Sequence, residues 1–198
     1  MPVSLRRLLR RNRFNCHRQD DRDWQERAET AATLWSGYRE EMAGAVGGEL
    51  QIADFGCGNE RLRGVLTEKL SEPFRYQGYD LHPQLPSTIR LNVRDALPEH
   101  HDLVFCLGLL EYLPDLEQFL PRLARVARFA IVSYVVADSP QALPEEERRK
   151  RGWASHYTRS EIADLCERSG LRVQRFAEID RGASGLWLAR SAAAEAVD

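Results

Sequence analysis

The sequence predicts a doubly wound α/β fold, in which a mostly parallel sheet carries helices on both faces. Three observations predict it. Short apolar runs alternate with helical patterns along most of the chain. The first of these runs leads into a tight glycine loop, Gly56-Cys57-Gly58, followed by a helical segment. The last two expected strands, 172–179 and 186–190, have no helix between them, so we expect an antiparallel pair at the end of the chain.

The individual elements follow from the spacing of apolar residues. The run 102–107 is almost entirely apolar, which is typical of a strand buried on both faces. Asp115 with Gln118, and Thr158 with Glu161, have the spacing of capping boxes at helix starts. The charged run 145–151 is expected to be exposed. In chain order, the expected helices are 21–46, 59–70, 115–127 and 158–170, and the expected strands are 50–55, 75–80, 88–92, 102–107, 129–136, 172–179 and 186–190.

Length and composition bound the type of protein. With 198 residues, we expect one domain over 21–198, preceded by a basic arm over 1–20. The net charge of −2 argues against a dedicated nucleic-acid binder. No apolar run approaches the roughly 20 residues that cross a bilayer. The cysteines are far apart and form no CxxC pair, which predicts reduced thiols in a cytoplasmic protein without a metal site.

The arm over 1–20 leaves two alternatives open. Six arginines precede the first acidic residue, and Leu5, Leu8 and Leu9 lie among them at helical spacing. A basic amphipathic helix can bind an anionic membrane surface or an acidic protein partner. A short charged segment can equally be a solvated arm. The pattern therefore allows association with a membrane or a partner without requiring it.

Three acidic residues end or follow successive expected strands: Asp54, Asp80 and Asp95. Because carboxyl ends of parallel strands meet at one edge, we expect the three side chains there. Asp80 lies 24 positions after Gly56, where a carboxylate can accept hydrogen bonds from both hydroxyls of a ribose. A carboxylate at Asp95 can accept a hydrogen bond from the exocyclic amine of a purine. The sequence therefore predicts an adenosine-containing ligand with a free ribose diol.

The glycine loop favours a ligand with an amino group over a dinucleotide. A dinucleotide fingerprint has a third glycine three positions after the second, and Arg61 stands there. Asp54, directly before the loop, suits a positive amino group better than a pyrophosphate. A nicotinamide-dependent oxidoreductase is therefore a less favoured alternative, and the antiparallel final pair also counts against it.

These motifs resemble the class I S-adenosylmethionine-dependent methyltransferases. The matching segments are Asp54-Phe55-Gly56-Cys57-Gly58, Tyr79-Asp80, Asp95-Ala96, the strand and turn over 102–115, and the late segment 153–171. The resemblance covers roughly 50–190 and implies a Rossmann-like, seven-stranded sheet with S-adenosylmethionine as the cofactor. It implies that Gly56 and Gly58 contact the methionine part, Asp80 the ribose, and Asp95 and Ala96 the adenine. The full set of cofactor-binding residues that we expect is Asp54, Gly56, Cys57, Gly58, Asp80, Leu81, Asp95, Ala96 and Leu107.

Methyl transfer itself asks little of the protein beyond alignment and exclusion of water, because the sulfonium is already activated. A hydroxyl or amine acceptor also needs a base for its proton. We expect Glu111 and His156 to be the catalytic residues; Tyr112, Tyr134 and Tyr157 are other candidates, and Tyr112 stands where many members of the family have a histidine. The expected acceptor is a small molecule, a sugar or a lipid-linked compound. The alternative is a partner subunit that binds S-adenosylmethionine without catalysis.

Overall fold

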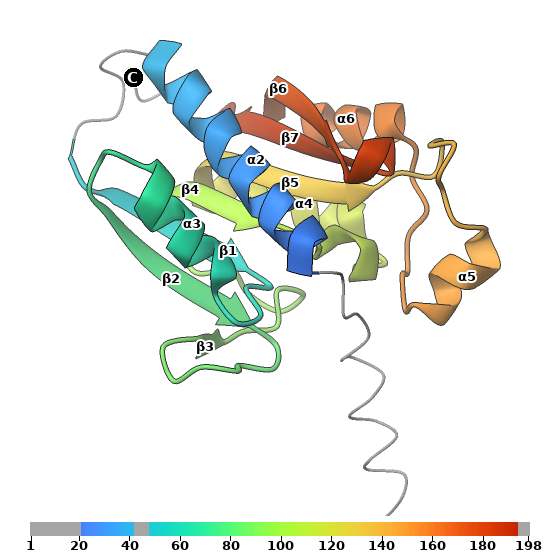
Figure 1. Cartoon of the computed structure of the whole chain (residues 1–198), viewed down its shortest axis with the longest axis horizontal. Helices are drawn as coiled ribbons and strands as arrows, with labels where there is room; N and C mark the ends of the chain where they lie inside the picture. Colours follow the sequence, from blue (N-terminus) through green and yellow to red (C-terminus); the bar gives the residue numbers. More distant parts are fainter. Residues whose placement is uncertain (1–20, 42–47, 194–198) are drawn as a thin grey trace, which may run out of the picture.

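A seven-stranded sheet forms the centre of the molecule, as Figure 1 shows for a computed structural model that describes residues 21–41 and 48–193. The strand order is β3-β2-β1-β4-β5-β7-β6. The pairs β2–β3, β1–β2, β1–β4 and β4–β5 are parallel, whereas β7 is antiparallel to both β5 and β6. The strands are β1 (Leu50–Phe55), β2 (Phe74–Asp80), β3 (Ile89–Arg90), β4 (His101–Cys106), β5 (Ala127–Val135), β6 (Leu171–Ile179) and β7 (Ser184–Ser191). The predicted fold class, including the antiparallel final pair, is confirmed.

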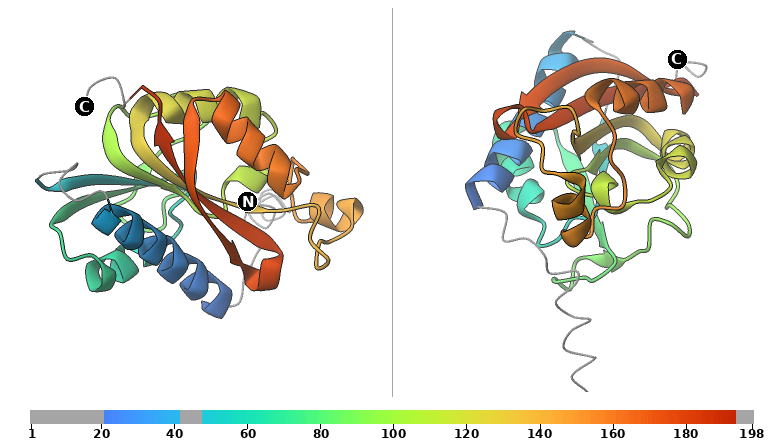
Figure 2. Two further views of the ribbon diagram at one scale, coloured as in Figure 1. Left: turned by 90° about the horizontal axis from the view of Figure 1, so that it is seen from above. Right: turned by 90° about the vertical axis from the view of Figure 1, so that its right-hand side faces the viewer.

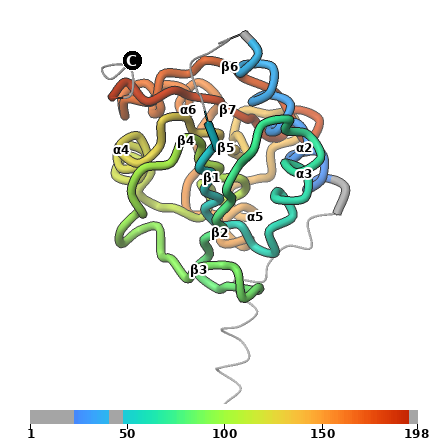
Figure 3. Tube along the Cα trace, turned by 90° about the vertical axis from the view of Figure 1, so that its left-hand side faces the viewer, coloured from blue at the N-terminus to red at the C-terminus, as the bar shows by residue number. Residues whose placement is uncertain are grey.

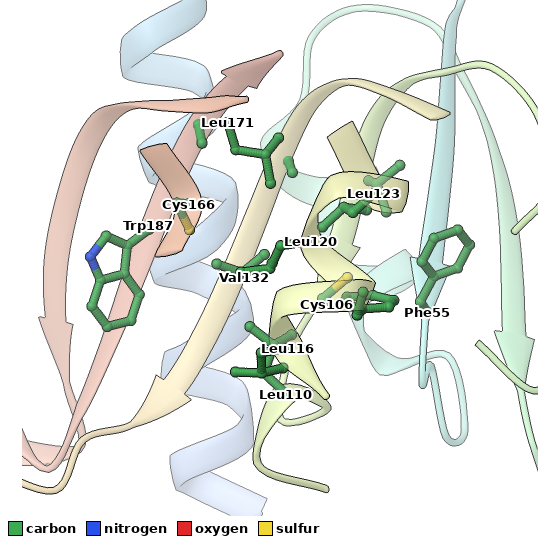
Figure 4. Close-up of a cluster of buried hydrophobic side chains, with 14 of the residues drawn as sticks. Phe55, Cys106, Leu110, Leu116, Leu120, Leu123, Val132, Cys166, Leu171 and Trp187 are labelled. Atoms are coloured by element: carbon green, nitrogen blue, oxygen red, sulfur yellow. The ribbon is translucent and has the colours of Figure 1, made fainter. Parts of the chain in front are cut away.

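Helices cover both faces of this sheet, as Figures 2 and 3 show. One face packs against α2 and α3 through a core that includes Trp35, Leu62 and Phe129. The opposite face packs against α4 and α6 through a second core around Leu120, Cys166 and Trp187, shown in Figure 4. The helices are α2 (Asp21–Glu41), α3 (Arg61–Lys69), α4 (Leu116–Val126), α5 (Glu145–Lys150) and α6 (Arg159–Arg168), with short 3-10 turns η1 (Leu110–Tyr112) and η2 (Asp180–Gly182).

Two local predictions were wrong. Asp115 precedes α4 without a side-chain capping bond, and its carboxylate lies 3.8 Å from Arg94 instead. The charged run 145–151 contains α5, and its Arg148 is buried rather than exposed. The capping box of Thr158 and Glu161 is confirmed at the start of α6. The expected strand 88–92 is reduced to the two residues of β3 at the sheet edge.

The basic arm and Cys16 lie outside the described residues, as does the expected end of the first helix beyond Glu41. None of the helices in the described part of the chain combines the length and apolar character that crossing a bilayer requires.

The strand order reverses between β1 and β4, since the chain continues from β1 to β2 on one side and β4 lies on the other. In open α/β sheets, ligands bind at such a reversal, beyond the carboxyl ends of the strands. The glycine loop after β1 and the turn after β4 both lie at this edge. The fold therefore places the candidate site between these two segments.

Gly78 on β2 provides a test of the packing beneath this edge. A Cβ atom at this position would lie 2.8 Å from both Cys57 Sγ and Glu60 Oε1. We expect Gly78→Ala to lower the free energy of unfolding by about 1–3 kcal/mol, because neighbouring atoms must shift. The matched control is Gly64→Ala in α3, where a Cβ atom would meet nothing within 4 Å. This control should raise the free energy of unfolding by about 0.5–1 kcal/mol in urea titrations, and similar effects of the two changes would contradict the packing described.

Candidate functional site

The glycine loop turns over the carboxyl end of β2. The main-chain N–H groups of Gly56 and Cys57 donate to the carbonyl of Tyr79, at 2.8 Å and 3.2 Å. Gly56 and Gly58 have positive φ angles of 78° and 55°, which favour glycine. A Cβ atom on Gly56 would lie 3.2 Å from the side chain of Leu109, whereas one on Gly58 would meet nothing within 4 Å. The loop therefore presents bare backbone, with open space at Gly58.

Asp80 connects the end of β2 to this loop. Its two carboxylate oxygens accept hydrogen bonds from main-chain N–H groups, one from Gly58 at 3.0 Å and one from His82 at 2.7 Å. The side chain is half-buried, and a carboxylate oxygen can accept more than one hydrogen bond. Asp80 therefore lies beside the loop with remaining capacity to accept hydrogen bonds from a ligand.

Asp54 is a buried carboxylic acid beneath the loop. One oxygen accepts a hydrogen bond from the hydroxyl of Tyr76 at 2.6 Å, and Oδ1 has no hydrogen-bond partner among the described residues. Burial raises the pKa of Asp54 to about 7, and the bond from Tyr76 offsets part of that rise. Neighbouring Asp80 and Glu60 raise this pKa further. An unpartnered oxygen in such a site favours a positively charged or hydrogen-bond-donating group nearby.

The titration of Asp54 predicts how stability depends on pH. Its pKa of about 7 in the folded protein lies above the ordinary value of 3.8, so the folded state binds the extra proton between these values. Stability should therefore fall as the pH rises through this window, by at most about 1.4 kcal/mol per pH unit. We expect the free energy of unfolding of the ligand-free protein to fall more between pH 5 and pH 7 than that of the Asp54→Asn variant. Urea titrations at both pH values measure this difference, and parallel curves would contradict the assignment.

Glu60 is a site residue that the sequence reading missed. It is buried in the left-handed conformation, with φ 58°, directly before α3. Its Oε1 accepts hydrogen bonds from the hydroxyls of Thr88 at 2.6 Å and Ser87 at 3.0 Å. Glu60 thereby fixes the segment before β3 against the glycine loop. The only signal in the sequence is its place, two positions after Gly58. Its left-handed backbone could not be predicted, because a glutamate rarely adopts this conformation.

The loop that follows β3 carries Asp95 and Ala96, and both residues are exposed. Arg122 of α4 holds this loop through the carbonyls of Val93, Arg94 and Asp95, at 2.9–3.0 Å. The loop is therefore anchored by its backbone, which leaves the carboxylate of Asp95 at the surface.

The structure places the two predicted leucines differently. Leu81 is 38% exposed after β2, whereas Leu107 is 1% exposed and packs in the core beneath α2 and α3. Leu109 lies against Gly56 instead, and its neighbour Leu110 is buried in the opposite core.

Glu111 follows the end of β4 and is 2% exposed. Its Oε1 accepts a hydrogen bond from the main-chain N–H of Val135 at 3.0 Å, and Oε2 has no partner among the described residues. Burial raises the pKa of Glu111, while the charges of Arg27 and Arg148 partly offset this rise. The structure therefore holds a buried carboxylate at the strand-order reversal, with one free oxygen and two cations near it.

Arg27 of α2 is the first of these cations, and sequence reading also missed it. It is 1% exposed, and its Nη2 lies 2.7 Å from Asp180 Oδ2 at the tip between β6 and β7. Its Nη1 lies 2.9 Å from where a Cβ atom of Gly108 would stand. Gly108 has a φ of 65°, so both its conformation and the nearby guanidinium require glycine. Arg27 therefore packs α2 against the turn that carries Glu111.

His156 is half-buried in the segment between α5 and α6. Its Nδ1 accepts a hydrogen bond from Nε of Arg148 at 3.0 Å. Burial, followed by the charge of Arg148, lowers the pKa of His156. In the same segment, the hydroxyl of Tyr134 donates to Ser155 at 3.0 Å and accepts from the main-chain N–H of Tyr157 at 3.1 Å. The segment is thus fixed against β5.

The three described cysteines, Cys57, Cys106 and Cys166, are buried and unpaired. Within residues 21–41 and 48–193, no three histidine, cysteine or acidic side chains come together in a way that could hold a metal ion.

Comparison with solved structures identifies the fold. The chain is similar to 1,6-didemethyltoxoflavin-N1-methyltransferase of Burkholderia thailandensis, with a TM-score of 0.65, 18% identity, and coverage of 96% of this chain and 92% of that one. It is also similar to the Haloferax volcanii Trm112 methyltransferase activator–putative methyltransferase complex, with a TM-score of 0.63, 14% identity, and coverage of 87% and 94%. A third similar structure is the mitomycin 7-O-methyltransferase MmcR, with a TM-score of 0.59, 18% identity, and coverage of 83% and 54%.

The chain spans about half the length of several of these proteins, including 55% of PhzM, 54% of MmcR and 53% of CalO1. No protein-family model and no curated protein matches the sequence. The structural likeness, together with the glycine loop and the antiparallel final strand pair, shows that the chain has the fold of the class I S-adenosylmethionine-dependent methyltransferases.

Proposed function

We propose that this protein binds S-adenosylmethionine at the glycine loop and transfers its methyl group to a small molecule. The open backbone at Gly58, the carboxylate of Asp80 beside it and the unpartnered oxygen of Asp54 beneath it support binding of a nucleoside that carries an amino acid. When bound, this cofactor supplies an activated methyl group. We assign Asp80 to the ribose, Asp95 and Ala96 to the adenine, and Asp54 with the loop to the methionine part.

The observation that carries the catalytic proposal is the free Oε2 of buried Glu111. A general base needs an unoccupied lone pair, and a raised pKa strengthens it as a base. We propose that Oε2 accepts the proton of an acceptor hydroxyl or amine, while the Val135 N–H holds Oε1. Arg27 and Arg148 favour the ionised carboxylate that this step requires. Because Nδ1 of His156 is occupied by Arg148, we assign the role of base to Glu111 and not to His156.

A small-molecule acceptor is supported by the similar structures. The Burkholderia thailandensis enzyme was crystallised with 1,6-didemethyltoxoflavin, and NcsB1 with 1,4-dihydroxy-2-naphthoic acid. Both ligands are compact ring compounds. We extend this acceptor class to the present chain as a proposal, with sugars and lipid-linked compounds as further members of the test panel.

Calorimetry followed by a transfer assay tests this function. We expect S-adenosylmethionine and S-adenosylhomocysteine to bind and NADH not to bind. Radiolabelled S-adenosylmethionine should then label at least one member of a panel of hydroxyl- and amine-bearing small molecules. Binding of NADH instead, or no heat with either sulfur nucleoside, would overturn the proposal.

The second candidate is a subunit that binds the cofactor without catalysis and acts through a protein partner. The similarity to the Haloferax volcanii structure supports this candidate, since that structure is a complex of a putative methyltransferase with the Trm112 activator. A buried carboxylate with a free oxygen is costly unless it is used, which favours the enzyme. Binding of S-adenosylmethionine without transfer to any panel member would favour the subunit.

A further inference from the structure

Arg148 is the buried exception in the charged run 145–151, and all of its nitrogens are engaged. Nη1 and Nη2 donate to the carbonyls of Val136 and Val135, at 3.1 Å and 2.7 Å, and Nε donates to His156. The guanidinium also lies 5.2 Å from the ring of Trp153. The other six members of the run are exposed. Arg148 therefore fixes the end of β5, α5 and the His156 segment to one another.

This arrangement determines which nitrogen of His156 carries the proton. An arginine can only donate, so Nδ1 of His156 must offer its lone pair. A neutral imidazole with an unprotonated Nδ1 carries its proton on Nε2. The structure gives Nε2 no hydrogen-bond partner among the residues it describes. His156 is therefore presented as a donor through a free Nε2–H.

His156 and Glu111 are linked through Val135 and Arg148. The N–H of Val135 donates to Glu111, and the carbonyl of the same residue accepts from Arg148, which holds His156. The main-chain N–H of Ala154 also donates to the carbonyl of Glu111 at 2.7 Å. In a strand, the N–H and C=O of one residue point to the same side. Both side chains are thus anchored at the end of β5, Glu111 directly and His156 through Arg148, one able to accept and the other to donate.

We infer that Arg148 is a positioning residue that fixes His156 as a hydrogen-bond donor toward the acceptor. The acceptor then carries a hydroxyl or amine for Glu111 and, next to it, a hydrogen-bond-accepting atom for His156, such as a carbonyl oxygen or a ring nitrogen. The acceptor class rests on the proposed function. The protonation of His156 is a property of the protein alone, so the claim about His156 and the claim about the acceptor can fail separately.

Nitrogen-15 NMR of the full chain tests the role of Arg148 without any acceptor. The His156 signals are assigned by their loss in His156→Gln. In the unsubstituted protein we expect the Nε2–H form with a pKa below the usual value, because burial and then the charge of Arg148 oppose protonation of the ring. Arg148→Met should raise this pKa and mix the two neutral forms. An Nδ1–H form in the unsubstituted protein, or spectra unchanged by Arg148→Met, would overturn the inference.

The acceptor class is tested with matched compounds. The rate of methyl transfer to 2-hydroxyacetophenone should exceed the rate to phenol by about tenfold or more, because one buried hydrogen bond contributes a free energy of this size. His156→Gln keeps a donor near the position of Nε2 and should retain this ratio, whereas His156→Phe should abolish it without changing the affinity for S-adenosylhomocysteine. Equal rates for the two compounds would overturn the acceptor class. If the cofactor binds but neither of these two compounds is methylated, the acceptor class is overturned. Only a lack of transfer to every compound of the panel would count against the proposed function.

Discussion

Replacing Glu111 by Gln is expected to lower the rate constant of methyl transfer by about 10²- to 10⁴-fold, the usual contribution of a general base. The amide has the same shape and keeps an oxygen for the Val135 N–H, but it cannot take up the acceptor's proton. Steady-state rates with radiolabelled S-adenosylmethionine measure the loss. The affinity for S-adenosylhomocysteine, whose sulfur is uncharged, should not change, because the hydrogen bonds of Glu111 go to Val135 and Ala154 and not to the glycine loop.

The control for this substitution is Glu117→Gln, which removes an exposed carboxylate from the first turn of α4. It should leave the rate unchanged. Urea titration of both variants distinguishes a loss of catalysis from a loss of stability. This control is needed because Gln at position 111 removes the negative charge beside Arg27 and Arg148. A Glu111→Gln variant that is folded and fully active would remove Glu111 from the mechanism.

Replacing Asp80 by Ala is expected to weaken binding of S-adenosylhomocysteine by about 100-fold or more. Each hydrogen bond to a charged group contributes roughly 1.5–3 kcal/mol to the binding free energy, and we propose that Asp80 accepts two of them from the ribose. The change also frees the N–H of Gly58 and of His82, so the loop loses its support from β2. Calorimetric titration measures the affinity of both proteins.

Asp164→Ala in α6 is the matched control for this experiment, because Asp164 is exposed and lies on the face of the sheet opposite α2 and α3. This variant should bind S-adenosylhomocysteine as tightly as the unsubstituted protein does. The affinity of Asp80→Asn should fall between those of Asp80→Ala and the unsubstituted protein, since an amide oxygen can replace one of the carboxylate oxygens. Unchanged affinity in Asp80→Ala would show that the nucleoside lies elsewhere.

The parts of the site that depend on local sequence were predictable. Gly56 and Gly58 are recognisable because a tight turn with positive φ needs glycine, and Asp80 because it ends a strand next to that turn. The fold followed from the alternation of strands and helices, and the antiparallel pair from a connection too short for a crossover. Each of these signals lies within a few residues of the feature it predicts.

The parts that depend on contacts between distant segments were not predictable. Arg27 reaches the site because α2 packs across the sheet to Asp180, which is 153 positions away in sequence. Arg148 lies in a run of seven charged residues, and nothing in that run distinguishes the one that turns inward. Leu107 was expected to bind the cofactor because the family resemblance implies it; the alternation of side chains along β4 places it in the core beneath α2, with Leu103 and Phe105.

A crystal structure of the protein with S-adenosylhomocysteine would show whether the edge of the sheet between β1 and β4 holds a sulfur nucleoside. We expect the ribose hydroxyls on the carboxylate of Asp80, the adenine beside Asp95 and Ala96, and the sulfur facing Glu111. A nucleoside bound away from the Gly56–Gly58 loop, or with its ribose out of reach of Asp80, would contradict it.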